Sequence, residues 1–368
     1  MIQYKKVTSA NQLFTGIAIF IIFFLLASST KALRSAEGPV DLTITKAQRS
    51  AEGPVELTIY PAKAGGLEQK YQLVVKAEDQ IDDDAVPLYE KAIKSIPKDF
   101  NQEQIREWLK LPAEQFPQQQ AEDALQKYIE PLKLMARAAR CKECKWTEWK
   151  PGDEPGDLGG YRKLAYILEM WARLEISRGG YEGSAIAIRT GFGMARHLGQ
   201  APTIVQGLVG ISVGAIMCRE VEQFLQIRES PNLYQTLVSL PRPFVDVEKA
   251  IENEKKVDLD LPANDIRRGQ TAEQKETTFD RVRLISKRLD NNLNGLQCVE
   301  AIRHYAAKHD GQLPENLSDI NQMEVPKDMM SGKMFEYSRT SAGAVLKSAM
   351  PEGGGPKDIF HYVIVLKK

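Results

Sequence analysis

Apolar residues recur at three- and four-residue intervals through the middle of the chain, which is the spacing of an amphipathic α-helix. The pattern starts with Val86, Tyr89 and Ile93, and Pro97 ends this first segment. Further helices are predicted at residues 105–110, 121–140, 161–178, 181–198 and 203–227. Short turns that contain Gly or Pro separate the last three helices. We therefore expect them to form antiparallel helical hairpins.

Two of the predicted helices carry a row of small residues on one face. The first row is Ser184, Ala187, Gly191 and Ala195, and the second is Gly207, Gly210, Gly214 and Cys218. Such a row forms a flat ridge that lets another helix approach closely. Residues 204–218 are apolar apart from Gln206 and Ser212, but the run is shorter than the ~20 residues of a membrane span. We therefore predict a buried central helix here.

Toward the N-terminus, apolar and polar residues alternate, which is typical of a half-buried strand. Residues 34–44 recur fifteen positions later at 49–59, with a single Asp-to-Glu change. We interpret this repeat as a local duplication whose two strands compete for one place. The second copy is predicted to form a small β-hairpin with residues 71–76, across the turn at Gly65-Gly66.

The C-terminal third combines a long helix with strands. Thr271 and Gln274 predict a capping box, from which a helix runs to Lys308 and ends at Asp310-Gly311. Short strands are then predicted near residues 334–338, 344–347 and 360–366, separated by Gly-rich turns. The stretch before the long helix, residues 231–268, is rich in Pro and charge and is interpreted as a connector.

Together these patterns predict a mainly α fold: a helical-hairpin bundle with a small N-terminal β-hairpin and a C-terminal helix plus antiparallel sheet. The predicted division is a signal peptide or anchor at 1–29, a β-rich segment at 30–80, a helical-hairpin domain at 81–240, a linker at 241–270, and a helix with a small sheet at 271–368.

The first 29 residues have the features of a targeting segment. Lys5 and Lys6 precede an apolar run at 13–27, and small residues follow it at Ala27, Ser28, Ser29 and Ala32. This pattern fits a cleaved signal peptide and a retained membrane anchor equally well. In either case we expect the rest of the chain to be exported across the cytoplasmic membrane and to be periplasmic, or membrane-anchored and facing outward.

Charge argues against one class of partner. Lys and Arg together number 49, as do Asp and Glu, so the formal net charge is zero. Proteins that bind nucleic acid through phosphate contacts usually show a basic excess or stripe. We therefore expect no nucleic-acid partner.

Cys141 and Cys144 are the principal candidates for chemistry. Their two-residue spacing is compatible with a structural disulfide, two plain thiols or a redox pair, and an exported compartment permits oxidation. Basic neighbours at Arg137, Arg140, Lys142 and Lys145 would favour a thiolate. However, the pair follows the C-terminus of a predicted helix, where the helix dipole disfavours negative charge.

No metal, cofactor or catalytic residue is predicted. Cys218 and Cys298 are isolated on predicted helices, whereas a zinc site commonly requires two cysteine pairs. His304 and His309 are five residues apart and so face different sides of a helix. His197 is expected to be a cation near a helix C-terminus. Acidic residues at 82–84 are expected to cap the helix that starts near Ala85.

Parts of the chain resemble known families. Residues from about 67 to 243 look like a widespread family of uncharacterised exported bacterial proteins. The stretches that carry the resemblance are Tyr71-Gln72-Leu73, Ala85-Val86-Pro87-Leu88-Tyr89, Cys144-Lys145-Trp146, Ala195-Arg196-His197-Leu198 and Leu240-Pro241-Arg242-Pro243. The family brings no assigned activity, and the resemblance implies only an exported location and a helical fold. The turn at Gly180-Tyr181-Glu182 is similar to that of a tetratricopeptide repeat, which implies repeat-like helical hairpins.

The C-terminal segment, about 301–345, is similar to the periplasmic end of type II secretion pseudopilins. The residues concerned are Tyr305, Asp310-Gly311-Gln312-Leu313-Pro314, Pro326-Lys327-Asp328 and Gly332-Lys333-Met334-Phe335-Glu336-Tyr337. The resemblance implies a helix that leads into an antiparallel sheet. The apolar run at 13–27 contains no Glu, whereas pseudopilins have one in their apolar helix.

These observations favour a non-enzymatic interaction or scaffold protein of the cell envelope, which binds a protein partner and meets the membrane through its N-terminal segment. One alternative is an accessory component of a secretion or pilus-like assembly, suggested by the C-terminal similarity. Another is a thiol–disulfide oxidoreductase that uses Cys141 and Cys144.

Overall fold

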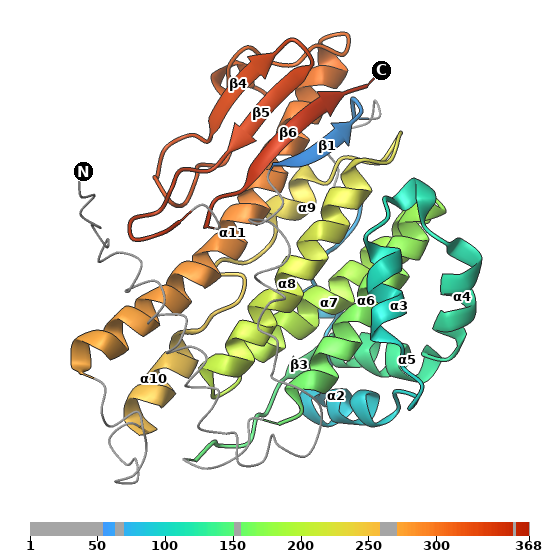
Figure 1. Ribbon diagram of the computed structural model, residues 1–368, viewed down its shortest axis with the longest axis vertical. Helices are drawn as coiled ribbons and strands as arrows, with labels where there is room; N and C mark the ends of the chain where they lie inside the picture. Colours follow the sequence, from blue (N-terminus) through green and yellow to red (C-terminus); the bar gives the residue numbers. More distant parts are fainter. Residues whose placement is uncertain (1–53, 63–69, 151–155, 258–270, 356–357, 368) are drawn as a thin grey trace, which may run out of the picture.

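The computed structural model describes residues 54–62, 70–150, 156–257, 271–355 and 358–367. The predicted targeting segment at 1–29 and the first copy of the repeat at 34–44 lie outside the described residues. Within them the fold is mainly α-helical with a small β-sheet, as predicted (Figure 1).

Three long helices form the centre of the molecule: α6 (Leu158–Ser177), α7 (Tyr181–Gly199) and α8 (Ile204–Leu225). They correspond to the predicted helical hairpins. Asp157 caps α6 by accepting a hydrogen bond from the backbone of Gly160, and Thr203 caps α8 in the same way. Helix α8 packs on α6, α7 and α11, which makes it the central helix of the fold.

Small residues allow α7 and α8 to pack closely, as the sequence predicts. A Cβ atom added to Gly210 of α8 would lie 2.6 Å from the carbonyl oxygen of Ala195 of α7. A Cβ atom added to Gly191 would clash with the sulfur of Met217 unless that side chain moved. Among the described helices, α8 alone is long and apolar enough to cross a membrane, and 67% of its most apolar window is buried inside the protein. The arrangement is that of a core helix.

Four shorter helices lie on one side of this centre: α2 (Ala85–Lys94), α3 (Gln102–Leu109), α4 (Gln118–Gln126) and α5 (Ile129–Ala138). The prediction of one helix over 121–140 is wrong, because α4 and α5 are separate. Pro131 lies in the first turn of α5, where its missing N–H has no partner to lose. In a continuous helix the same proline would break a hydrogen bond and clash with the preceding turn.

The C-terminal part follows the predicted order. Helix α11 (Ala272–Lys308) starts with the predicted capping box of Thr271 and Gln274. Asp310 and Gly311 after its end have positive φ angles, 52° and 74°. The strands β4 (Glu336–Thr340), β5 (Gly343–Lys347) and β6 (His361–Leu366) pair antiparallel beside α11 (Figure 1).

The predicted N-terminal β-hairpin is wrong. Strand β1 (Val55–Ile59) pairs in parallel with β6, at the far end of the chain, and the sheet order is β1-β6-β5-β4. Residues 71–76 form no strand, and Tyr71 and Leu73 are buried in the core instead. Burial of Leu57 and Ile59, both 0% exposed, against the C-terminal sheet outweighs the local pairing that the intervening turn suggested.

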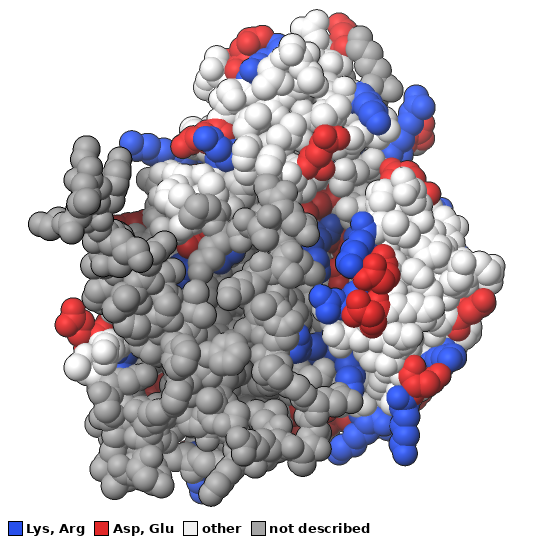
Figure 2. Space-filling model, viewed as in Figure 1, with Lys and Arg blue, Asp and Glu red and all other residues white. Residues whose placement is uncertain are grey.

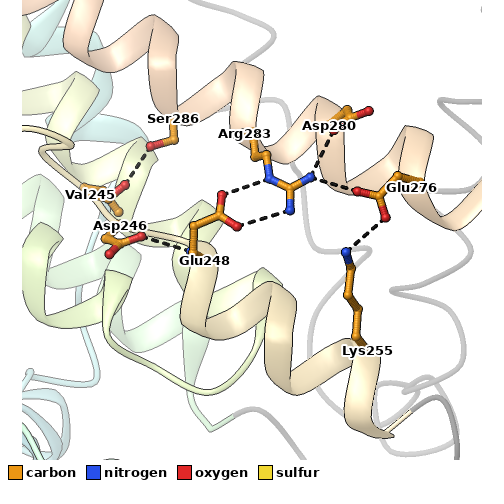
Figure 3. A network of polar contacts seen from close by, with 8 residues as sticks. All are labelled: Val245, Asp246, Glu248, Lys255, Glu276, Asp280, Arg283 and Ser286. Atoms are coloured by element: carbon orange, nitrogen blue, oxygen red, sulfur yellow. Dashed lines mark hydrogen bonds and ion pairs between the residues drawn. The ribbon is translucent and has the colours of Figure 1, made fainter.

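The predicted connector contains two helices, α9 (Tyr234–Val238) and α10 (Glu248–Val257). Figure 3 shows how α10 is held to α11: Arg283 donates two hydrogen bonds to Glu248, at 2.9 and 3.1 Å, and also contacts Glu276. Lys255 completes this link with an ion pair to Glu276, at 3.0 Å. One hydrophobic core runs from Leu57 to Ile364 through all of these elements.

Candidate functional site

The two candidate cysteines lie where a small two-stranded sheet meets the helical bundle. Strand β2 (Ile81–Asp84) pairs in parallel with β3 (Cys141–Glu143). Asp84 then caps α2, as predicted: its carboxylate accepts hydrogen bonds from the backbone N–H groups of Val86, at 3.2 Å, and Lys145, at 2.9 Å. These two bonds fix the segment that carries Cys144 against the start of α2.

Both cysteines are free thiols in the structure. The sulfur of Cys141 donates to the carbonyl of Arg137 in α5, at 3.6 Å, and that of Cys144 donates to the carbonyl of His197 in α7, at 3.9 Å. The two sulfurs therefore bond to different helices. The structure thus shows two separate thiols at these positions.

The surroundings favour the protonated form of both thiols. Burial, with help from Asp83, raises the pKa of Cys141 to about 11, and Arg137 lowers it only in part. Burial and Asp84 raise the pKa of Cys144 to about 12. The expectation that four basic neighbours would favour a thiolate is wrong, because burial and the carboxylates of Asp83 and Asp84 outweigh them, and Arg137 is itself paired with Asp83 at 2.8 Å.

His197 connects these thiols to two aromatic side chains. Its Nδ1 lies 3.0 Å from the hydroxyl of Tyr89, and its backbone carbonyl accepts a hydrogen bond from Trp146 Nε1, at 2.9 Å. Burial lowers the pKa of His197 to about 4. The prediction of a cation at this helix end is therefore wrong, since the imidazole is neutral at pH 7.

Tyr161 completes what we call the aromatic–thiol cluster, which comprises Tyr89, Cys144, Trp146, Tyr161 and His197. The ring of Tyr161 lies edge-on to Tyr89, with 5.9 Å between centroids, and 6.0 Å from Trp146. Its hydroxyl is buried and has no hydrogen-bond partner among the described residues. Three of the stretches that carry the family resemblance meet in this cluster, although Tyr89 and His197 are 108 residues apart.

A second polar group, which sequence reasoning missed, lies between α6 and α8. We call it the buried charge network: Glu169 and Arg173 of α6 with Arg219 and Glu220 of α8. Arg173 donates to both oxygens of Glu220, and Arg219 donates to Glu169 at 2.8 Å. The available signal was the spacing of Glu169 and Arg173, which are four residues apart and are the only charged residues in the stretch 164–174 of α6.

Glu169 is the member of the buried charge network whose carboxyl group lacks a full set of hydrogen bonds to the described residues. One of its oxygens is bound to Arg219, whereas the other is buried without a partner among the described residues. Burial raises the pKa of Glu169 to about 7, and Arg219 opposes this shift. A carboxyl group of this kind exchanges a proton near neutral pH.

The remaining candidates have separate partners. His304 Nε2 lies 3.2 Å from the side-chain oxygen of Gln322, whereas His309 stacks on Tyr305 with 3.7 Å between centroids. In the described part of the chain, no three His, Cys, Asp or Glu side chains come together as a metal site.

No protein-family model matches the chain, and neither the curated proteins nor the solved structures include a match to it.

Proposed function

We propose that this protein is a non-enzymatic interaction protein of the cell envelope that binds an extended segment of a protein partner. The observation that carries the proposal is the open edge of the sheet at β4. This strand pairs with β5 on one side, and no described strand pairs with its other side. An open edge presents backbone N–H and C=O groups that an incoming strand can bind.

The exposure of β4 is consistent with such binding. Glu336, Ser338, Arg339 and Thr340 are all exposed. The other edge strand of the sheet, β1, is covered by contrast: the backbone N–H of Thr58 donates to the side chain of Gln226, at 3.1 Å. Among the described strands, β4 therefore offers the more open edge to a partner.

Charges along β4 limit which strands can pair with it. Glu336 forms an ion pair with Lys347 of β5, at 2.9 Å, and Arg339 is paired with Glu315. Charged side chains on an edge strand discourage indiscriminate pairing. We therefore expect a partner segment whose charges complement Glu336 and Arg339.

The polar residues of the aromatic–thiol cluster and the buried charge network support an interaction role, because their hydrogen bonds and ion pairs connect helices and strands of the fold. Tyr89 of α2 and Cys144, just after β3, both bond to His197 of α7, and the buried charge network joins α6 to α8. On the face shown in Figure 2, basic and acidic side chains lie side by side over the described elements. The apolar run at 13–27 supports placement in the envelope.

Photo-cross-linking in envelope-intact cells tests the proposal. A photoreactive residue replaces Ser338 on β4 and, as a matched control, the exposed Glu103 on α3. We expect a discrete protein adduct from position 338 and none from position 103. Equal, diffuse labelling from both positions, or recovery of the chain in the cytosol, would contradict the proposal.

An accessory role in a secretion or pilus-like assembly is a second candidate, favoured by the arrangement of α11 beside an antiparallel sheet. The same cross-linking experiment separates the two, because the second candidate requires the adduct at position 338 to contain a subunit of such an assembly. An unrelated envelope protein in the adduct would exclude it.

A further inference from the structure

Strand β1 lies alongside β6 at the edge of the sheet, and we call the position that it occupies the β1 slot. It pairs with β6 from Val55 opposite Tyr362 to Ile59 opposite Leu366. Beyond the strand, Arg303 of α11 holds the chain twice: its side chain donates to the carbonyl of Tyr60, and its own carbonyl accepts from the N–H of Ala62, both at 3.1 Å.

The slot selects its occupant mainly through two apolar side chains and the backbone. Leu57 and Ile59 are buried against the core, whereas Glu56 points outward and is exposed. The bonds to β6, Arg303 and Gln226 all involve backbone atoms of the strand segment. A different segment with the same two apolar residues and an extended backbone would satisfy the same contacts.

The first copy of the repeat is such a segment. Residues 40–44 read Val-Asp-Leu-Thr-Ile, and residues 55–59 read Val-Glu-Leu-Thr-Ile, so the one difference falls at the exposed position of Glu56. Ala47 corresponds to Ala62, whose N–H binds Arg303. Thr45 replaces Tyr60, but it supplies the same backbone carbonyl to the arginine.

We propose that the β1 slot accepts either copy of the repeat, so that the same chain has two arrangements that differ by a fifteen-residue shift. With residues 55–59 in the slot, 25 residues (30–54) separate the targeting segment from the strand, and with residues 40–44 in the slot the number falls to 10 (30–39). At ~3.3 Å per extended residue, the maximum reach of the folded part from that segment changes from about 80 to about 33 Å.

The two arrangements differ in the loop that follows the strand. The loop to Tyr71 contains residues 60–70 when the second copy is bound and residues 45–70 when the first is bound, an increase from 11 to 26 residues. Each doubling of a flexible loop disfavours its closure by roughly threefold. The increase is little more than one doubling, so we expect the second copy to predominate by about threefold to fourfold.

Cysteine trapping in the purified full-length chain tests the proposal. Thr58 lies opposite Val365 in the register, and Thr43 corresponds to Thr58. Three double variants are compared by mass spectrometry after mild oxidation: Thr58→Cys, Thr43→Cys or Gln48→Cys, each with Val365→Cys. Gln48 is the control, because it is close to Thr43 in sequence but outside either copy.

We expect an intrachain cross-link from position 58, about threefold to fourfold less from position 43, and only background from position 48. A yield from position 43 no higher than from position 48 would overturn the proposal, as would a cross-link from position 43 found only between two chains. The assay uses isolated protein, so its result is independent of whether β4 binds a partner.

A stability comparison provides a second readout. Leu57→Ser with Ile59→Ser disables the second copy, Leu42→Ser with Ile44→Ser disables the first, and a fourfold variant disables both. We expect either double variant to unfold at a denaturant concentration close to that of the unmodified chain, and the fourfold variant to unfold well below it. If disabling the second copy alone costs as much as disabling both, the first copy does not occupy the slot.

Discussion

The guanidinium of Arg173 and the carboxylate of Glu220 form an ion pair with two hydrogen bonds, 2.9 and 2.7 Å long, in the interior of the bundle. Their side chains are 4% and 0% exposed. Another nitrogen of Arg173 donates to the carbonyl of Leu111, at 2.7 Å, so the pair joins the connection after α3 to both α6 and α8. Burial removes water from both charges, and the attraction between the two charges offsets this loss of hydration.

Removal of one partner of this pair should therefore lower the free energy of unfolding substantially. We expect Glu220→Gln to lower the free energy of unfolding by about 3–5 kcal/mol, because Arg173 then remains as a buried charge without its counter-ion. Urea denaturation measures this loss. The control is Glu122→Gln, which disrupts the exposed pair of Glu122 with Arg178 and should cost less than ~1 kcal/mol. Equal losses for the two variants would mean that the buried pair is no more important than a surface one.

Glu169 should make stability decrease toward alkaline pH. Its pKa is raised to about 7 in the folded protein, so between the ordinary value and pH 7 the folded state binds more protons than the unfolded state. The stabilisation is complete below pH ~4.5 and is lost as the pH rises through 7. The difference in unfolding free energy between the unmodified chain and Glu169→Gln should therefore fall from pH 5 to pH 8. A flat difference would show that Glu169 is ionised throughout.

His197 should make the stability of the protein decrease toward acidic pH. Its pKa is lowered to about 4 by burial, so between pH 6.5 and 4 the unfolded state takes up a proton that the folded state does not. Stability linked to His197 is present above pH 6.5 and is lost as the pH falls, by about 3 kcal/mol at pH 4. His197→Asn, which retains a polar group near Tyr89, should reduce this acid sensitivity in denaturation curves. If this variant loses as much stability at acidic pH as the unmodified chain does, His197 is not the group responsible for the loss.

The local parts of the fold were predictable from sequence, whereas its long-range pairings were not. The capping box of Thr271 and Gln274 and the close approach at Gly210 depend on residues a few positions apart or on one helix face, and the sequence pattern contains that information. The partner of β1 could not be deduced in the same way. Nothing near Val55 distinguishes β6 from the nearer segment at 71–76.

The candidate site was predicted in part. Cys141 and Cys144 were identified by their spacing, but their raised pKa values depend on burial and on Asp83 and Asp84, which lie about sixty residues earlier. The buried charge network was missed for a related reason. Arg219 and Glu220 follow the apolar run at 204–218 within the predicted helix, but their position in the sequence does not indicate that Glu220 is fully buried against α6.

The two candidate thiols should react slowly in the folded protein. With pKa values of about 11 and 12, Cys141 and Cys144 have very little thiolate at pH 8. We expect alkylation by iodoacetamide to be at least about a hundredfold slower than for an unperturbed cysteine. Mass spectrometry after timed quenching measures the rate, and the same protein in guanidinium should react at all four cysteines. Rapid modification of either thiol in the folded state would favour the oxidoreductase alternative.

Two glycines of α8 provide a matched test of the close contact with α7. Gly→Ala in a helix interior gains up to ~1 kcal/mol of helix propensity when the new methyl group has room. At Gly207 the nearest atom to an added Cβ is a methyl group of Val247, at 3.2 Å, so a small side-chain movement suffices. At Gly210 the nearest atom is the backbone oxygen of Ala195, at 2.6 Å, with Leu198 Cβ at 3.0 Å.

Because a backbone oxygen within α7 cannot move without shifting that helix, we expect Gly210→Ala to lower the free energy of unfolding by about 1–3 kcal/mol. Gly207→Ala should be neutral or slightly stabilising in the same urea titration. If both variants are neutral, α7 and α8 can separate at little cost, and the small-residue rows are then not required for packing. If both are equally destabilising, the contact with Val247 is as rigid as the one with Ala195, and α10 is held to α8 as firmly as α7 is.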